Sequence, residues 1–197
     1  MNDFLIGVFL ATLIIALFTT RLYRLLFWYS FNSFTLGLLA LSIGEDLNDN
    51  ALLISGGLTL VIKALIIPYV LKHITQKSKL ERSIRPRIKI HNAIMLVPAI
   101  LVFTFYLTEP ITNQISNHAN YVAISITALF LALLLMIEHK VVMARIVGFL
   151  VLENSLFLLG TTATNGMPML VELGILFDLM MAIVVINLLL RNERITA

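Results

Sequence analysis

The chain of 197 residues contains no cysteine. Without a thiol it can form no disulfide, no thiolate metal site and no iron–sulfur cluster. Its four histidines, His73, His91, His118 and His139, fall at the ends of apolar segments, and none pairs with another at metal-ligand spacing on one helix. We therefore interpret them as interfacial or loop residues, and we expect no metal and no cofactor.

Charge is also scarce. Charged residues make up 13% of the sequence and hydrophobic residues make up 59%, whereas a soluble domain is about 25% charged and roughly 45–50% apolar. This composition excludes a soluble globular protein. It predicts an all-α integral membrane protein with a single transmembrane domain over 1–197.

The motifs of enzymes and of exported precursors are missing as well. Met1-Asn2-Asp3 provides no basic start of a signal peptide, and no Ala-x-Ala-like cleavage site follows, so we expect the first apolar run to be retained as a helix. The sequence shows no nucleophile–base constellation, phosphate-binding loop or cofactor motif. It therefore predicts no catalytic residues and no enzyme activity of the chain on its own.

Seven apolar segments have the roughly 17–25 residues that a transmembrane helix needs. They cover approximately 3–20, 25–43, 51–71, 92–108, 120–137, 141–160 and 168–190. The acidic stretch 44–50 is predicted to be a turn between two of them. Asn165-Gly166-Met167-Pro168 is another, and it places a proline at the first position of the last helix.

Basic residues are absent from the connections on one side of this seven-helix arrangement. Thirteen of the 14 Lys and Arg residues fall on the other side: Arg21, Arg24, Lys72, Lys77, Lys79, Arg82, Arg85, Arg87, Lys89, Lys140, Arg145, Arg191 and Arg194. The side without them holds Asp3, Glu45, Asp46, Asp49 and Glu109. Because cytoplasmic loops are enriched in Lys and Arg, we predict an external N-terminus and a cytoplasmic C-terminus, in a bacterial or archaeal cell membrane.

The stretch 72–91 is predicted to be a basic cytoplasmic loop. It either sets the topology near anionic lipids or docks a cytoplasmic partner subunit. It has no aromatic residues or recognisable nucleic-acid-binding fold around it, so we expect no nucleic-acid partner.

Four ionisable residues interrupt the apolar segments: Lys63, Glu153, Glu172 and Asp178. At about 1.5 Å of rise per residue, Lys63 and Glu153 each lie roughly 18 Å from the start of their segments, and Asp178 lies roughly 15 Å from the start of its own. These three are therefore expected near the middle of the bilayer, whereas Glu172 lies only about 6 Å below the outer boundary.

Side chains of this kind at one depth can pair, or can pass a proton between helices. Burial disfavours the charged form of an ionisable group, so these residues can load and release a proton, as relays require. A static ion pair is the alternative for Glu153 and Asp178, and stabilisation by a helix N-terminus is the alternative for Glu172. Two deep carboxyls and one lysine leave one carboxyl over, which favours titration.

Smaller features point to helix irregularity and close packing. Pro68 follows Lys63 by five residues and is expected to kink the third helix and to free a backbone carbonyl near Lys63. Gly37 and Gly56-Gly57 are predicted to be close-packing points. Asn154, beside Glu153, is expected to hydrogen-bond between helices.

The last two segments carry a longer pattern. It reads VGFLVLENSLFLLG over 147–160 and GMPMLVELGILFD over 166–178. This pattern, with the mid-membrane Lys63 followed by Pro68, resembles the component E family of hydrogenase-4, a membrane-arm subunit of group 4 nickel–iron hydrogenase and formate hydrogenlyase-type complexes. That family is in turn similar, over its last three helices, to the K subunit of respiratory complex I.

The resemblance implies a non-catalytic membrane-arm subunit of an energy-converting redox complex. Its partners would be antiporter-like and other membrane-arm subunits, peripheral redox subunits at the basic loop, and lipids. The two K-subunit glutamates map onto Glu153 and Asp178, while Glu172 and Lys63 belong to the longer family only. All four residues would join a path for protons or Na⁺. The alternatives are a stand-alone seven-helix transporter and a purely structural membrane scaffold.

Overall fold

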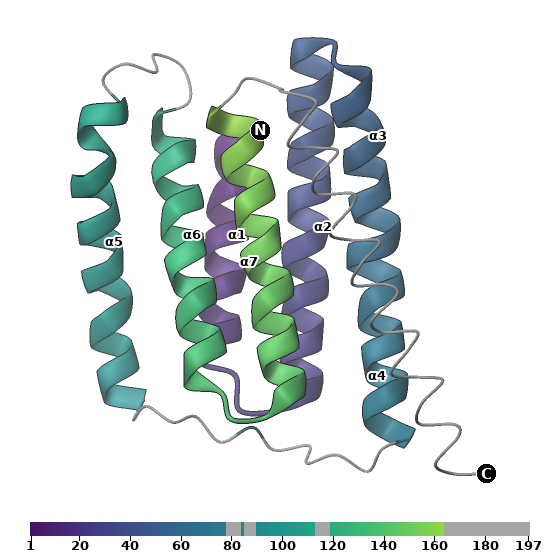
Figure 1. Ribbon diagram of the computed structural model, residues 1–197. Helices are drawn as coiled ribbons and strands as arrows, with labels where there is room; N and C mark the ends of the chain where they lie inside the picture. The colour runs from purple at the N-terminus through teal and green to yellow at the C-terminus, as the bar shows by residue number, and fades with distance from the viewer. Residues whose placement is uncertain (78–83, 85–89, 113–118, 164–197) are drawn as a thin grey trace.

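The computed structural model describes residues 1–77, 84, 90–112 and 119–163 (Figure 1). The regular elements within these ranges are all helices: α1 (Asn2–Leu17), α2 (Leu22–Leu47), α3 (Asn50–Leu58), the π-helix η1 (Thr59–Ile66), α4 (Ile67–Lys77), α5 (Ile90–Thr112), α6 (Ala119–Glu138) and α7 (Val142–Ala163). Five helical stretches are long and apolar enough to cross a membrane, with α3, η1 and α4 forming one of them. The all-helical, membrane-type architecture is confirmed for the described residues.

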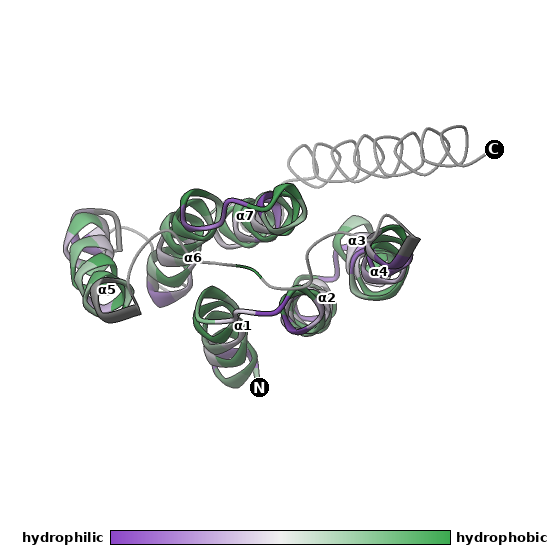
Figure 2. Ribbon diagram, turned by 90° about the horizontal axis from the view of Figure 1, so that it is seen from below, coloured by the Kyte–Doolittle hydropathy of each residue, from purple (hydrophilic) through white to green (hydrophobic). Residues whose placement is uncertain are grey.

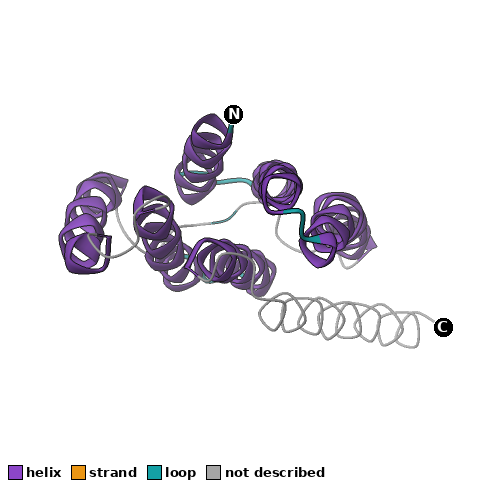
Figure 3. Cartoon of the chain, turned by 90° about the horizontal axis from the view of Figure 1, so that it is seen from above, coloured by secondary structure: helices purple, strands orange, loops and turns teal. Residues whose placement is uncertain are grey.

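The helices run alternately up and down, and α2 lies at the centre of the contacts (Figure 1). It packs against α1, α3, η1, α4 and α7, while α6 packs against α1, α5 and α7. Viewed along the helices, α5 forms one edge of the described helices and the α3–η1–α4 stretch forms the opposite edge (Figures 2 and 3). Because α2 contacts both η1 and α7, these two helices lie close to each other beside α2.

The two ends of the bundle carry opposite charge. At the end where α1 begins, Asn2 Nδ2 donates to Asp46 of α2 at 3.2 Å, and the Tyr121 hydroxyl of α6 donates to Asp3 at 2.7 Å. At the other end Ile84 N donates to the Thr20 carbonyl at 2.8 Å, which places a residue of the basic stretch against the α1–α2 connection. Arg21 and Lys140 lie in the α1–α2 and α6–α7 connections at this end, whereas Asp3 and Asp46 lie at the opposite end, so the charge separation expected from the sequence is present in the described part of the bundle.

Several predicted boundaries differ from the observed ones. The first helix is shorter than the predicted 3–20 and ends at Leu17. Just after its end, the Thr19 hydroxyl donates a hydrogen bond to the Ile15 carbonyl. The acidic stretch 44–50 is mostly helical. Here α2 continues to Leu47, and the turn consists of Asn48, at φ 53°, and Asp49, which caps α3 by accepting from Ala51 N at 2.9 Å.

The predicted loop 72–91 is longer than the connection between the observed helices. Helix α4 continues to Lys77 and α5 begins at Ile90. The apolar stripe of the helix extends past position 71, with Leu71 and Ile74 buried. The Thr75 hydroxyl donates a hydrogen bond to the Leu71 carbonyl at 2.7 Å. The predicted last helix, 168–190, with Glu172 and Asp178, lies outside the described residues.

Two of the predicted glycine contacts are present. A Cβ at Gly37 would lie 2.6 Å from Leu60 Cγ, and a Cβ at Gly56 would lie 3.1 Å from the Leu41 backbone nitrogen, so both allow α2 to approach α3 and η1 closely. At Gly57 no atom of the described residues lies within 4 Å of a Cβ, so that part of the prediction was wrong. Gly148, which the sequence did not single out, meets Met136 in the same way and joins α7 to α6.

Candidate functional site

Lys63 lies inside the π-helix η1 and is 1% exposed. Its neighbours Val61, Leu65 and Ile66 are 53%, 67% and 49% exposed and form the outer face of the same turn. The lysine therefore faces the protein interior, together with Thr59 and Ala64 of the same segment. Short π-helical segments are rare and occur frequently at functional sites.

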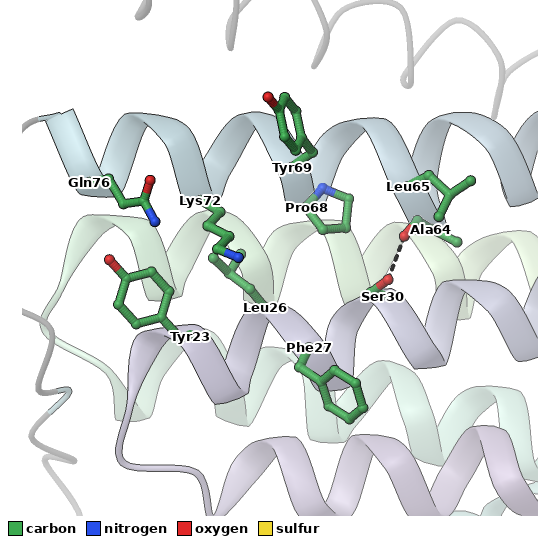
Figure 4. A pocket seen from close by; sticks show the side chains of 10 residues that line it. All are labelled: Tyr23, Leu26, Phe27, Ser30, Ala64, Leu65, Pro68, Tyr69, Lys72 and Gln76. Carbon is green, nitrogen blue, oxygen red and sulfur yellow. Dashed lines mark hydrogen bonds between the residues drawn. The ribbon is translucent and has the colours of Figure 1, made fainter.

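Pro68 accounts for part of this irregular backbone. A residue at position 68 of an α-helix would donate its N–H to the Ala64 carbonyl, but proline has no N–H. The Ser30 hydroxyl of α2 donates to that carbonyl instead (Figure 4). The prediction of a freed carbonyl beside Lys63 is thus confirmed, and the structure supplies the donor that satisfies it. The irregularity takes the form of the π-helix Thr59–Ile66.

Glu153 lies in the middle of α7 and is 5% exposed. Its Oε1 atom is 3.2 Å from Lys63 Nζ. Each residue is roughly 15–20 Å along its helical stretch from the nearer end, at about 1.5 Å per residue, and a hydrocarbon core is about 30 Å thick. The expectation that the two groups share one depth and can pair is confirmed.

A buried hydrogen-bond network lies next to this ion pair. Asn154 Nδ2 donates to Asn32 Oδ1 at 3.1 Å and to Ser33 Oγ at 2.9 Å, which joins α7 to α2. Asn32 Nδ2 in turn donates to the Phe9 carbonyl at 3.0 Å and to Thr12 Oγ1 at 3.1 Å, which joins α2 to α1. All the side chains of this network are nearly inaccessible. The expected role of Asn154 as an interhelical hydrogen bonder is confirmed.

The network fixes the position of α7 relative to α1 and α2, and it thereby fixes Glu153. Apolar side chains alone allow a helix to rotate or slide at small cost, whereas a buried amide must keep its partners. Sequence reasoning missed Asn32, Ser33 and Ser30, because single polar residues in an apolar helix carry no signal of which helix they face.

Two further buried ionisable residues lie at the basic end of α6. Glu138 is 2% exposed and His139 is 0% exposed. His139 Nδ1 is 3.0 Å from the Leu135 carbonyl, and Arg145 Nε donates to the His139 carbonyl at 3.0 Å. Burial lowers the pKa of His139, which hydrogen bonds to the backbone of Leu135 and Thr19 partly offset. His139 lies in the short connection between α6 and α7, as expected of a loop residue, but its side chain is buried rather than at the surface.

No cluster of three or more His, Asp or Glu residues suited to a metal ion occurs within the described ranges. The pairing of Lys63 with Glu153 is thus the feature there that joins two sequence-predicted site residues. Glu172 and Asp178 lie outside the described residues.

Comparisons with known proteins give one relative and no family. No protein-family model matches the chain. No solved structure matches it significantly. The chain is similar to Uncharacterized protein Rv0085 of Mycobacterium tuberculosis, with 26% identity over 144 residues. The match covers 72% of this chain and 66% of that protein, so this chain spans just under two thirds of its relative's length.

Proposed function

We propose that the protein is a non-catalytic membrane-arm subunit of an energy-converting redox complex of the hydrogenase-4 or complex I type. In this proposal it contributes mid-membrane ionisable side chains to a path for protons or Na⁺. The observation that carries the proposal is the ion pair between Lys63 and Glu153, with 3.2 Å between Nζ and Oε1 and both side chains buried.

The position of this pair in the membrane favours a role in ion movement. An ionisable side chain in a membrane-spanning segment is costly, and such residues usually mark substrate or ion pathways. The pair joins two helical stretches that are long and apolar enough to span a membrane, α3–η1–α4 and α7. A proton that moves from the ammonium to the carboxylate leaves both groups neutral, so the pair can discharge without an isolated charge being left in a low-dielectric medium.

The sequence resemblance supports the same proposal. Glu153 is the residue that the resemblance aligns with a mid-membrane glutamate of the complex I K subunit, and it is the residue that meets Lys63. The proposal assigns Glu172 and Asp178 to the same path. It also places antiporter-like subunits beside this chain and peripheral redox subunits at its basic end.

The proposed orientation follows from the charges at the two ends. The end that holds Arg21, Lys72 and Lys140 would face the cytoplasm, in a seven-helix protein of the bacterial or archaeal cell membrane.

The proposed partners can be tested by copurification. If the chain is a subunit of such a complex, a tag on it should purify other membrane-arm subunits with it, and mass spectrometry of the purified material would identify them. Recovery of the chain alone, with solute flux in liposomes, would instead support a stand-alone transporter.

The test of the proposed path uses the assembled complex in proteoliposomes with a pH-sensitive dye. Glu153→Gln keeps the shape of the side chain and removes its proton exchange, so we expect assembly to be retained and ion translocation to fall at least tenfold. The double variant Lys63→Met/Glu153→Leu is the matched control for a structural role, because replacing a buried ion pair by apolar residues is often neutral for stability. A complex that translocates normally with this double variant would show that the pair is only a scaffold.

A further inference from the structure

A groove runs along the outer face of the molecule between α2 and the η1–α4 stretch (Figure 4). It has a volume of about 640 Å³, which is within the roughly 300–1,000 Å³ typical of ligand sites. One wall is formed by the start of α2 and the other by successive turns of η1 and α4. It is open to the surroundings of the bundle, because Leu65 and Tyr69 are 67% and 71% exposed.

The polar groups of this groove gather at one end. Figure 4 shows the side chains of Tyr23, Lys72 and Gln76 reaching into the gap between the two helices. This end lies beside the basic connections of the bundle. Lys72 is exposed and provides a positive charge there.

The rest of the groove is apolar. Leu26, Phe27, Leu65 and Pro68 line it, and its far end is closed at Ser30 and Ala64, whose hydroxyl and carbonyl hydrogen-bond to each other. The helix from position 76 to position 64 is about 18 Å long at about 1.5 Å per residue. This length is close to one leaflet of hydrocarbon, which is about half of the roughly 30 Å core.

We propose that this groove binds one anionic phospholipid from the leaflet at the basic end. The phosphate would lie against Lys72, Tyr23 and Gln76, and one acyl chain would follow the apolar part toward Ala64. A phospholipid satisfies each feature at once: a charged head at the basic end, an apolar tail of one leaflet's length, and access from the side rather than from water. Basic pockets between transmembrane helices are known to take phospholipid head groups.

Such a lipid would end next to the candidate site. Ala64 follows Lys63 directly, so the acyl chain would cover the irregular backbone of η1 and shield the interhelical contact between Ser30 and Ala64. This inference does not depend on the proposed ion path, because the groove and its charge are present whatever the ion pair does.

The first experiment measures head-group recognition. The purified, delipidated protein is titrated with phosphatidylglycerol or with phosphatidylcholine of the same acyl chains, and bound lipid is counted by native mass spectrometry. We expect phosphatidylglycerol to bind more tightly, and Lys72→Gln to weaken its binding about fivefold, the equivalent of the roughly 1 kcal/mol that one basic side chain contributes near an anionic surface. Lys140→Gln is the matched control, an exposed lysine at the same end but outside the groove. Equal losses in the two variants, or no preference between the lipids, would overturn the proposal.

The second experiment tests the acyl-chain part. Leu65→Trp places a large side chain in the groove, whereas Val61→Trp places one on the same exposed face one turn away, outside it. We expect Leu65→Trp to lower the amount of phosphatidylglycerol retained by the protein at least fivefold relative to Val61→Trp. If Leu65→Trp instead dissociates a dimer of this chain without changing the bound lipid, the groove is a surface for a second copy and the lipid proposal is wrong.

Discussion

The Lys63 ammonium and the Glu153 carboxylate lie 3.2 Å apart in the interior of the bundle, on a π-helix and on an α-helix that are far apart in the chain. Each group would be costly to bury alone, and together they compensate each other. The contact between them depends on two local structural features, the irregular backbone before Pro68 and the hydrogen-bond network around the Asn154 amide.

The first prediction concerns the ion pair. Lys63→Met removes the cation from beside a buried carboxylate and is expected to lower the free energy of unfolding by about 3–5 kcal/mol. In the background of Glu153→Leu the same change should cost far less, because no carboxylate is left behind. Unfolding in mixed micelles of the wild type, both single variants and the double variant measures the coupling, and equal costs in both backgrounds would contradict it.

The second prediction concerns the carbonyl of Ala64. Ser30→Ala removes the donor to this carbonyl and should cost about 1–3 kcal/mol, the penalty of a buried polar group without a partner. Pro68→Ala restores a backbone N–H that can reach the same carbonyl. The serine should therefore contribute less in a Pro68→Ala protein, as read from the same four-variant unfolding cycle. An unchanged contribution would mean that Pro68 is not the reason the serine is needed.

The third prediction concerns the contact of α6 with α7. A methyl group at Gly148 would lie 2.7 Å from Met136 Cγ and 3.1 Å from the Met136 backbone nitrogen, so the helices must move apart. Gly148→Ala is expected to lower the melting temperature. Gly57→Ala is the control, since no atom of the described residues lies within 4 Å of a methyl group there, and the change from glycine to alanine favours the helix. Equal melting temperatures for the two variants would show that α6 and α7 can separate at no cost.

The fourth prediction concerns the network beside Glu153. Asn154→Ala removes two hydrogen bonds to α2. Since interhelical hydrogen bonds in membranes are worth about 0.6 kcal/mol on average and at most about 1.7 kcal/mol, the loss should be roughly 1–3 kcal/mol. Leu156→Ala, at an exposed position of the same helix, should cost less in the same unfolding assay. The reverse order would show that the apolar contacts, and not the amide, hold α7 in place.

The fifth prediction concerns pH. Burial lowers the pKa of His139 below its ordinary value of 6.5, so the unfolded chain takes up a proton at a higher pH than the folded protein does. Stability is therefore highest above the ordinary pKa and falls as pH decreases below it. His139→Asn can still donate to the Leu135 carbonyl but cannot titrate in this range. Melting temperatures are measured from pH 7.5 to pH 5.5 in steps of about one pH unit. Over this range we expect the melting temperature of the wild type to drop more than that of the variant. Parallel pH profiles would contradict the prediction.

Much of the architecture could be predicted because it depends on local properties of the chain. Long apolar segments, polar turns and the one-sided placement of lysine and arginine are visible residue by residue. The helix ends were less predictable. Leu71 and Ile74 continue an apolar stripe into a region rich in charge, and only the packing of α4 against α2 makes the helical form of that stretch favourable.

The candidate site was predictable in part for the same reason. An ionisable residue in an apolar helix, such as Lys63 or Glu153, is conspicuous in the sequence, and so is a proline that must leave a carbonyl free. The roles of Ser30 and Asn32 could not be predicted, because their hydrogen-bond partners lie on other helices and the sequence does not show which helices face them. His139 lies at a segment end in the sequence, and its burial depends on how the end of α6 packs against the rest of the bundle.

The sequence by itself determined that the described part of the protein is a bundle of helices long and apolar enough to span a membrane, and that Lys63 and Glu153 lie deep within their helices, because position along a helix follows from counting residues. Only the tertiary structure decided that Lys63 meets Glu153 and that Ser30 meets Ala64. A contact between helices depends on how each helix is rotated and which helix is its neighbour, and close-packed glycines and buried amides far apart in the chain set both.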